Sequence, residues 1–303
     1  MHANSMCISC MIAKQEKLIR NFQDDNKKSE YMHEVLGILH QHGYTESSPW
    51  LAEKINQLYE IYWGTAEDYS SLKHRYNALL LEKEQDIIQK IKASTNCLKE
   101  CLKYACVGNY IDFSAVENVS KDTLTALLER VSTEHISEEE FRYFQHDLEN
   151  AKTLVYLTDN CGEIVLDKLL IQHIQELYPQ IKITVILRGK NVLNDATLED
   201  AEELGLTKLV HCIGNGNGAP GTVFKSLSEE AKQALTDADV IISKGQGNFE
   251  SMVSEGFNPY YIFLCKCELF VRRFGLKQYD GVFVKEERLH IENGKEIIDF
   301  KKI

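Results

Sequence analysis

Six short runs in the second half of the 303-residue chain are apolar along most of their length rather than at alternate positions. Strands with this pattern are buried on both faces, which is typical of parallel sheets covered by helices. Helical stretches are expected between them at about 164–178, 197–204, 228–236 and 249–254. The sequence therefore predicts a three-layer α/β/α sandwich with a mostly parallel, Rossmann-like sheet. The runs are TLVYL (153–157), KITVIL (182–187), KLVHCI (208–213), DVIIS (239–243), YYIFLC (260–265) and GVFV (281–284).

The first half of the sequence has a different pattern. Only four of the 17 glycines lie before residue 151, and apolar residues recur at helical spacing, most regularly over 68–94. We expect an all-helical N-terminal domain, 1–150, that walls or lids a pocket, and an α/β/α catalytic domain, 151–303. The other expected helices of the first domain are 11–23, 31–41, 49–63, 97–107, 121–131 and 137–151.

Charge and composition exclude several classes of partner. The chain carries 46 acidic and 34 basic residues, a net charge of -12, which disfavours binding to a nucleic-acid backbone. Its apolar runs are far shorter than the ~20 residues that span a bilayer, so we expect no membrane association. Nine cysteines, an odd number, fit reduced thiols and a cytoplasmic protein. Nothing in the sequence indicates the oligomeric state.

Polar and glycine-rich segments follow each of the first four expected strands. In open parallel sheets, ligands bind beyond the carboxyl ends of the strands, so these segments should share one rim. Carboxylates, amides, cations and glycine loops would then lie together. The segments are 158–163, 188–195, 214–222 and 244–250.

The residue types on this rim indicate phosphoryl chemistry assisted by a metal ion. Asp159, Asn160 and Asp195 offer the oxygen ligands that Mg²⁺ or Mn²⁺ prefers. Arg188 and Lys244 are natural counter-charges for a phosphoryl group, and glycine loops that open helices offer backbone N–H groups to its oxygens. Each Asp or Asn after a strand is also open to a simpler interpretation as a helix cap.

The glycine loop after the third strand allows a competing interpretation. Gly216, Gly218 and Gly221 match the spacing of a dinucleotide-binding fingerprint. That fingerprint belongs to the first strand–helix turn, however, and Pro220 interrupts this one. The next strand should also end in an acidic residue, whereas here it ends at Lys244. We therefore favour phosphate over a dinucleotide.

Seven segments of the chain match the pattern of a known family. Four follow strands: TDNCGEIVLDKLL from 158, LRGKNVLNDATLEDAEELGL from 187, GAPGT from 218 and ISKGQGNFE from 242. Three lie in the helical half: CISC (7–10), the region of Asp68, Tyr69 and Lys73, and GNYID (108–112). Together they resemble the damage-control phosphatases, first catalogued as domain of unknown function 89, and specifically the branch with an N-terminal CxxC.

This resemblance implies a metal-dependent hydrolase of phosphomonoesters of small metabolites, such as sugar phosphates or damaged phosphometabolites. One divalent ion (Mg²⁺, Mn²⁺, Co²⁺ or Ni²⁺) would be held by Asp159, Asn160 and Asp195. Lys244 would hold the phosphate, with Gly162, Glu163 and Arg188 close by. We add Gly245 and Asn248, which follow Lys244, as further phosphate-binding candidates. The sequence departs from the expected small residue at Cys161.

Three alternatives to this mechanism and function remain open from the sequence. Metal-assisted, in-line attack by water is our preferred chemistry, but Asp159 at a strand end also suits an aspartyl-phosphate nucleophile. A second class of function is a carboxyl methyltransferase that uses S-adenosylmethionine. A third is a non-enzymatic metal- or redox-binding protein built on Cys7, Cys10, Cys265 and Cys267.

Asn109 and Asp112 are further candidates for the rim, contributed by the helical half of the chain. The alternative is that they form a turn that ends a helix.

Overall fold

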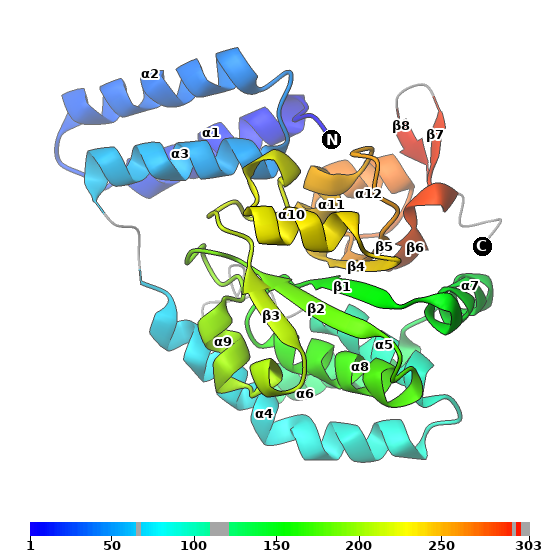
Figure 1. Ribbon diagram of the computed structural model, residues 1–303. Helices are drawn as coiled ribbons and strands as arrows, with labels where there is room; N and C mark the ends of the chain where they lie inside the picture. The colour runs from blue at the N-terminus through cyan, green and yellow to red at the C-terminus, as the bar shows by residue number, and fades with distance from the viewer. Residues whose placement is uncertain (65–67, 110–120, 293–294, 298–303) are drawn as a thin grey trace.

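The computed structural model describes residues 1–64, 68–109, 121–292 and 295–297. Its centre is a six-stranded sheet with strand order β3-β2-β1-β4-β5-β6 (Figure 1). Neighbouring strands are parallel except β6, which pairs antiparallel to β5. The predicted mostly parallel sheet is therefore confirmed. The strands are β1 (Thr153–Leu157), β2 (Lys182–Leu187), β3 (His211–Gly214), β4 (Val240–Lys244), β5 (Tyr260–Leu264) and β6 (Gly281–Lys285).

Helices cover both faces of this sheet, as the continuous apolar strands predict (Figure 1). On one face lie α8 (Glu163–Leu177) and α9 (Leu198–Glu203), with α4 (Ser70–Ala93) and α5 (Cys97–Gly108) from the first half of the chain. On the other lie α10 (Glu229–Thr236), α11 (Gly245–Met252) and α12 (Glu268–Phe274). Helix α12 was not predicted.

The helices of the first half divide between two hydrophobic cores. Helices α1 (Ser5–Ile19), α2 (Asp25–His42) and α3 (Ser48–Trp63) pack around Tyr31, Val35 and Leu51 in a core of their own. By contrast, α4, α5, α6 (Lys121–Glu129) and α7 (Glu138–Asn150) contribute to the core that also covers one face of the sheet. Near residue 150, where the sequence predicts a domain boundary, the chain changes from helices alone to alternating strands and helices. The residues on both sides of this point contribute to the same hydrophobic core.

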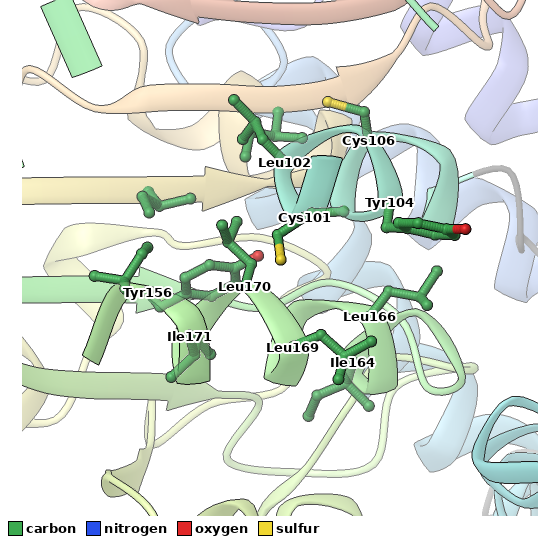
Figure 2. Packing of buried hydrophobic residues seen from close by; sticks show 14 of the residues in the cluster. Cys101, Leu102, Tyr104, Cys106, Tyr156, Ile164, Leu166, Leu169, Leu170 and Ile171 are labelled. Carbon is green, nitrogen blue, oxygen red and sulfur yellow. The ribbon is translucent and has the colours of Figure 1, made fainter. Parts of the chain in front are cut away.

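Helix α5 packs directly on α8, which brings the helical half to the sheet (Figure 2). Leu102 and Cys106 of α5 are completely buried, as are Leu166 and Leu170 of α8 and Tyr156 of β1. Removing one such side chain to alanine typically costs about 2–5 kcal/mol, so this contact is held firmly. As a consequence, the carboxyl end of α5 lies beside the amino end of α8.

The remaining elements lie at the carboxyl end and in the loops. A two-stranded hairpin, β7 (His290–Glu292) and β8 (Lys295–Ile297), follows β6 and was not predicted. Short 3-10 turns are Arg130–Thr133, Leu206–Lys208, Phe224–Ser226 and Glu286–Arg288. Among the helices of the described residues, none is long and apolar enough to cross a bilayer.

The order of the strands determines where a ligand can bind. From β1 the chain proceeds outward to β2 and β3 on one side, then returns to β4 beside β1 and proceeds to β5 and β6 on the other. The connections therefore diverge between β1 and β4, and the carboxyl ends of two such strands are where open α/β sheets bind their ligands. Asp159 follows β1 and Gly245 follows β4, so the predicted site residues lie at this switch point.

Candidate active site at the carboxyl ends of β1, β2 and β4

Two loops form the floor of the candidate site, the β1–α8 turn (158–162) and the β2–α9 loop (188–197). Backbone hydrogen bonds join them: the Ala196 N–H donates to the Asp159 carbonyl and the Cys161 N–H to the Asn194 carbonyl, each over 2.8 Å. An isolated antiparallel bridge also pairs Asn160 with Asp195. The expectation that residues 159, 160 and 195 meet at one rim is realised in the backbone.

Asp159 lies in a cluster of carboxylates. Its Oδ2 accepts hydrogen bonds from the side-chain amides of Asn109, at 2.9 Å, and Asn160, at 2.8 Å. Burial, with the nearby charges of Glu163 and Asp195, raises the pKa of Asp159 to about 8, even though Arg188 opposes this shift. Its side chain is 15% exposed, so the cluster remains reachable from solvent. The site therefore holds more negative charge than its own cations neutralise.

Gly245, the first residue of α11, leaves space for the Asp159 carboxylate. Its φ of +81° is favourable only for glycine, and a Cβ atom there would lie 2.2 Å from the carboxylate carbon and Oδ2 of Asp159. Ordinary contacts begin near 3.4 Å. The backbone at the start of α11 thus approaches Asp159 as closely as the chain allows, and the amino end of this helix faces the carboxylate cluster.

Arg188 is buried beside Asp159, and one of its two terminal NH2 groups has no hydrogen-bond partner among the described residues. Its Nε donates to Asp195 Oδ2 at 2.6 Å, and its Nη1 donates to Asn248 Oδ1 at 3.0 Å. Its Nη2 is buried with no hydrogen-bond partner in the described part of the chain, and lies 3.7 Å from Asp159 Oδ1. Leaving such a donor unsatisfied is costly, so it indicates a site for an oxygen that is supplied from outside.

Lys244 has a different place from the one expected. Its side chain is 0% exposed, and its Nζ donates to the Ala105 carbonyl at 2.8 Å, Glu163 Oε1 at 2.6 Å and Asp167 Oδ1 at 2.5 Å. Although burial favours the neutral amine, these two carboxylates outweigh it and raise the pKa of Lys244. All three donors of the ammonium are used internally, so its direct contact with phosphate does not follow from this geometry.

Glu163 and Asn248 are also held by several partners. Glu163, which is completely buried, accepts hydrogen bonds from Asn109, Asn160 and Lys244. Asn248 donates to the carbonyls of Thr158 and Lys244, and its Oδ1 accepts from Arg188. Asn248 therefore orients Arg188, and its side chain is not turned toward an open position.

Two further residues belong to the site: Asn109, which the sequence offered as a rim candidate or a helix-ending turn, and Lys266, which was not predicted. Asn109 ends α5, donates to Asp159 and Glu163, and accepts from the Leu264 N–H of β5 at 3.2 Å. Lys266 follows β5, is half-buried, and its charge lowers the pKa of Asp159. Extending the strand-end rule to the fifth strand would have found Lys266. The companion candidate of Asn109, residue 112, lies outside the described residues.

The donor set fits a hard divalent cation with a water-rich shell. The carboxylates of Asp159 and Asp195 lie on joined loops beside amide groups, and an ion would relieve their mutual repulsion. The amide oxygen of Asn160 faces Asn194 Nδ2, at 2.9 Å, in this arrangement. No group of three or more His, Cys, Asp or Glu side chains forms a metal site anywhere in the described ranges. An ion here would thus rely on two carboxylates, amide oxygens and water.

The glycine loop after β3 is packed internally and does not form a nucleotide cradle. A Cβ on Gly221 would lie 2.6 Å from the Gly247 carbonyl oxygen and 2.8 Å from Pro49 of α3. The N–H of Gly218 donates to Glu53 Oε1 at 3.2 Å, and the N–H of Ala219 to Asn217 Oδ1 at 3.0 Å. These glycines permit close packing, and the dinucleotide interpretation has no support in this geometry.

The cysteines stay separate. All nine are free thiols in the structure, and Cys7 and Cys10 lie on α1. Within the described ranges they are not gathered with Cys265 and Cys267 into a metal-binding group. Cys161 is completely buried in the β1–α8 turn, and burial raises its pKa well above that of an ordinary thiol. It therefore behaves as a small packing residue beside Asp159.

A carboxylate cluster and a buried arginine lie at the switch point of a doubly wound sheet, which is where α/β proteins of this class bind their ligands. The sequence narrows this class, because residues 3–282 match the damage-control phosphatase ARMT1-like domain. The chain belongs to this family.

Individual relatives agree with this assignment. A damage-control phosphatase of Archaeoglobus fulgidus is 29% identical over 304 residues, which cover 93% of this chain and 98% of the relative. A damage-control phosphatase of Pyrococcus horikoshii is 30% identical over 267 residues, or 86% of this chain and 90% of the relative. The crystal structure of a DUF89 family protein from P. horikoshii superposes with a TM-score of 0.80 at 25% identity, covering 94% of this chain and 99% of that one.

Proposed function

We propose that this protein is a metal-dependent phosphatase that hydrolyses phosphomonoesters of small metabolites, such as sugar phosphates or damaged phosphometabolites. The observation that carries the proposal is the pairing of an over-charged carboxylate cluster around Asp159 with the unsatisfied, buried Nη2 of Arg188. A dianionic phosphate with a divalent ion satisfies both at once. The names of the relatives from A. fulgidus and P. horikoshii support the same reaction class.

The carboxylates of Asp159 and Asp195 and the amide oxygen of Asn160 would hold the ion. When bound, Mg²⁺, Mn²⁺, Co²⁺ or Ni²⁺ supplies Lewis-acid polarisation of the ester and a water of lowered pKa. Arg188 then donates from Nη2 to an equatorial phosphate oxygen while Asp195 and Asn248 keep its guanidinium in place. Lys266, half-buried at the same rim, is the second cation for the phosphate.

Lys244 and Asn109 act on the reaction by orienting other groups. Lys244 neutralises the charge of the Glu163 carboxylate. The side-chain amide of Asn109 donates to both Glu163 and Asp159 and so holds the two carboxylates in place. Glu163, completely buried and held by three partners, cannot swing away from the rim. Helix α11 begins at Gly245 beside Asp159, so the N–H groups of its first turn would be available to a bound phosphate.

We favour attack by water over an aspartyl-phosphate. The aspartyl-phosphate scheme needs a second acidic residue two positions after the nucleophile, and that position is Cys161. Burial raises the pKa of this thiol, so it stays protonated at neutral pH and cannot replace a carboxylate as the base. Asp159 itself is already engaged by two amide donors. These contacts suit a fixed ligand better than a nucleophile.

The test is hydrolysis of a chromogenic phosphate ester by metal-stripped protein, with Mg²⁺, Mn²⁺, Co²⁺ or Ni²⁺ added back singly. We expect turnover only with an added ion, and its loss by at least about 100-fold in Asp159→Asn and Asp195→Asn proteins that remain folded. Asp237→Ala, an exposed carboxylate after α10, is the matched control and should keep full activity. Equal turnover in chelator would refute the metal role, and heat of binding with S-adenosylmethionine would favour the methyltransferase alternative.

A further inference from the structure

Helix α4 supplies none of the expected ligands, yet two of its polar side chains are buried against the loops that do. Lys73 is 4% exposed and Asn77 is 0% exposed. Figure 1 shows α4 on the same side of the sheet as α8 and α9. The β1–α8 turn leads into the first of these helices and the β2–α9 loop into the second. Buried polar groups are costly unless fully partnered, so their contacts indicate what they hold in place.

Asn77 holds the β1–α8 turn. Its Oδ1 accepts a hydrogen bond from the Gly162 N–H at 2.7 Å, and its Nδ2 donates to Asp200 Oδ1 at 2.9 Å. Gly162 has a φ of +71° and is the residue directly before Glu163, where the chain turns into α8. One amide therefore connects the turn that carries Asp159 to a carboxylate on α9.

Lys73 holds the β2–α9 loop from the same helix face. Its Nζ forms an ion pair with Asp200 Oδ2 at 2.7 Å and donates to Thr197 Oγ1 at 3.1 Å and Asn191 Oδ1 at 3.3 Å. Residues 191 and 197 lie on either side of Asp195. A buried cation in the first turn of a helix is disfavoured by the helix dipole and by desolvation. A lysine placed here in spite of both costs, with three partners on this loop and the start of α9, indicates a role beyond packing.

We propose that Lys73 and Asn77 are positioning residues that fix the two loops relative to each other and so set the separation of the Asp159 and Asp195 carboxylates for the divalent ion. This inference rests on the proposed function. A strained residue supports it: Leu193, in the second loop, has a φ of +47°, which a branched side chain adopts only when its surroundings hold it there. Lys73 of α4 donates to Asn191 and Thr197, which lie on either side of this residue in the loop.

The experiment measures Mn²⁺ affinity by calorimetry, together with kcat and KM for the chromogenic ester, in Asn77→Ala and Lys73→Met. Outer-shell groups typically change metal affinity 10- to 100-fold, so we expect the Mn²⁺ Kd to rise at least about tenfold. Activity should recover at saturating Mn²⁺ with KM for the ester unchanged. Lys73→Arg, which keeps the charge opposite Asp200, should restore part of the affinity.

The matched control is Glu84→Gln. Glu84 pairs with Lys168 at 2.5 Å, which joins α4 to α8 away from the two loops. This variant should lower the melting temperature while the Mn²⁺ Kd stays within twofold of the wild type. If Asn77→Ala does not fold, the comparison of Lys73→Met with Lys73→Arg decides the same question.

The outcomes separate the two proposals. Unchanged Mn²⁺ affinity in Asn77→Ala and Lys73→Met, with wild-type protein that binds the ion, would overturn the positioning role alone and leave a structural one. Absence of Mn²⁺ binding by the wild-type protein would overturn the proposed function and this inference with it. A Kd that rises in the α4 variants but not in Glu84→Gln supports the role.

Discussion

Substitution of Gly245 by alanine tests the geometry of the site with one methyl group. The new Cβ would lie 2.2 Å from the Asp159 carboxylate, against an ordinary contact of 3.4 Å, a difference of 1.2 Å. The carboxylate must therefore move by about 1 Å, and a displacement of this size at a reacting centre costs on the order of 100-fold in rate. That loss corresponds to about 2.7 kcal/mol of transition-state stabilisation. We expect kcat/KM to fall by this factor.

A backbone penalty accompanies the clash and has to be separated from it. Alanine at positive φ costs about 1–2 kcal/mol in the folded state, partly offset because alanine restricts the unfolded chain. Gly256 offers the control, because its φ is +87° and a Cβ there would meet nothing within 4 Å. Gly256→Ala should lose similar stability in urea unfolding but keep kcat/KM within twofold. Equal activity of the two variants would refute the reasoning.

Three further predictions concern charged side chains. Lys266→Ala should raise KM for the ester about tenfold with little change in stability, because its half-buried ammonium lies near Asp159; steady-state kinetics decide this. Lys244→Met should lower the free energy of unfolding by about 3–5 kcal/mol, since it leaves two buried carboxylates without their counter-charge; urea titration measures the loss. Asp239→Ala should cost about 1 kcal/mol at pH 7, because backbone N–H groups at the start of β1 bond its carboxylate and lower its pKa. That contribution is complete above the unfolded pKa of about 3.9 and is lost as pH falls through the lower folded pKa. The stability difference from wild type should narrow as pH falls below about 4, and a constant difference would contradict it.

The sheet could be predicted because its strands are buried on both faces. The predicted runs 153–157 and 239–243 are apolar along most of their length, and β1 and β4 match them to within one residue. The convergence of Asp159 and Asp195 followed from the same inference, since parallel strands bring their carboxyl ends to one edge. The antiparallel pairing of β6 could not be predicted in the same way, because a short apolar edge strand has the same sequence pattern in either direction.

The direction of the Lys244 side chain was beyond the sequence. Successive residues of a strand point to opposite faces, so Lys244 shares the face of Val240 and Ile242. Those two residues pack in the core formed with α5 and α8, whereas Ile241 packs on the other face. Which helices cover each face depends on long-range packing, and this decides whether a cation at the strand end meets solvent or Asp167.

The role of Asn109 was equally hard to predict, for a related reason. Its segment is about 50 residues before Asp159 in the chain, and it reaches the site only because α5 docks on α8. A short motif at the end of a helix indicates a turn by local rules. The packing of α5 on α8, whose Leu102 and Leu166 belong to one hydrophobic core, places that turn beside the site residues.

The central claim is that Asp159 and Asp195 share one divalent ion, and anomalous diffraction at the manganese edge tests it most directly. Crystals grown with MnCl₂ should show one strong anomalous peak between the two carboxylates, with oxygen distances of about 2.0–2.2 Å and water in the remaining positions. Crystals of Asp195→Asn should lose most of that peak. Well-ordered carboxylates with no anomalous density between them would contradict the account.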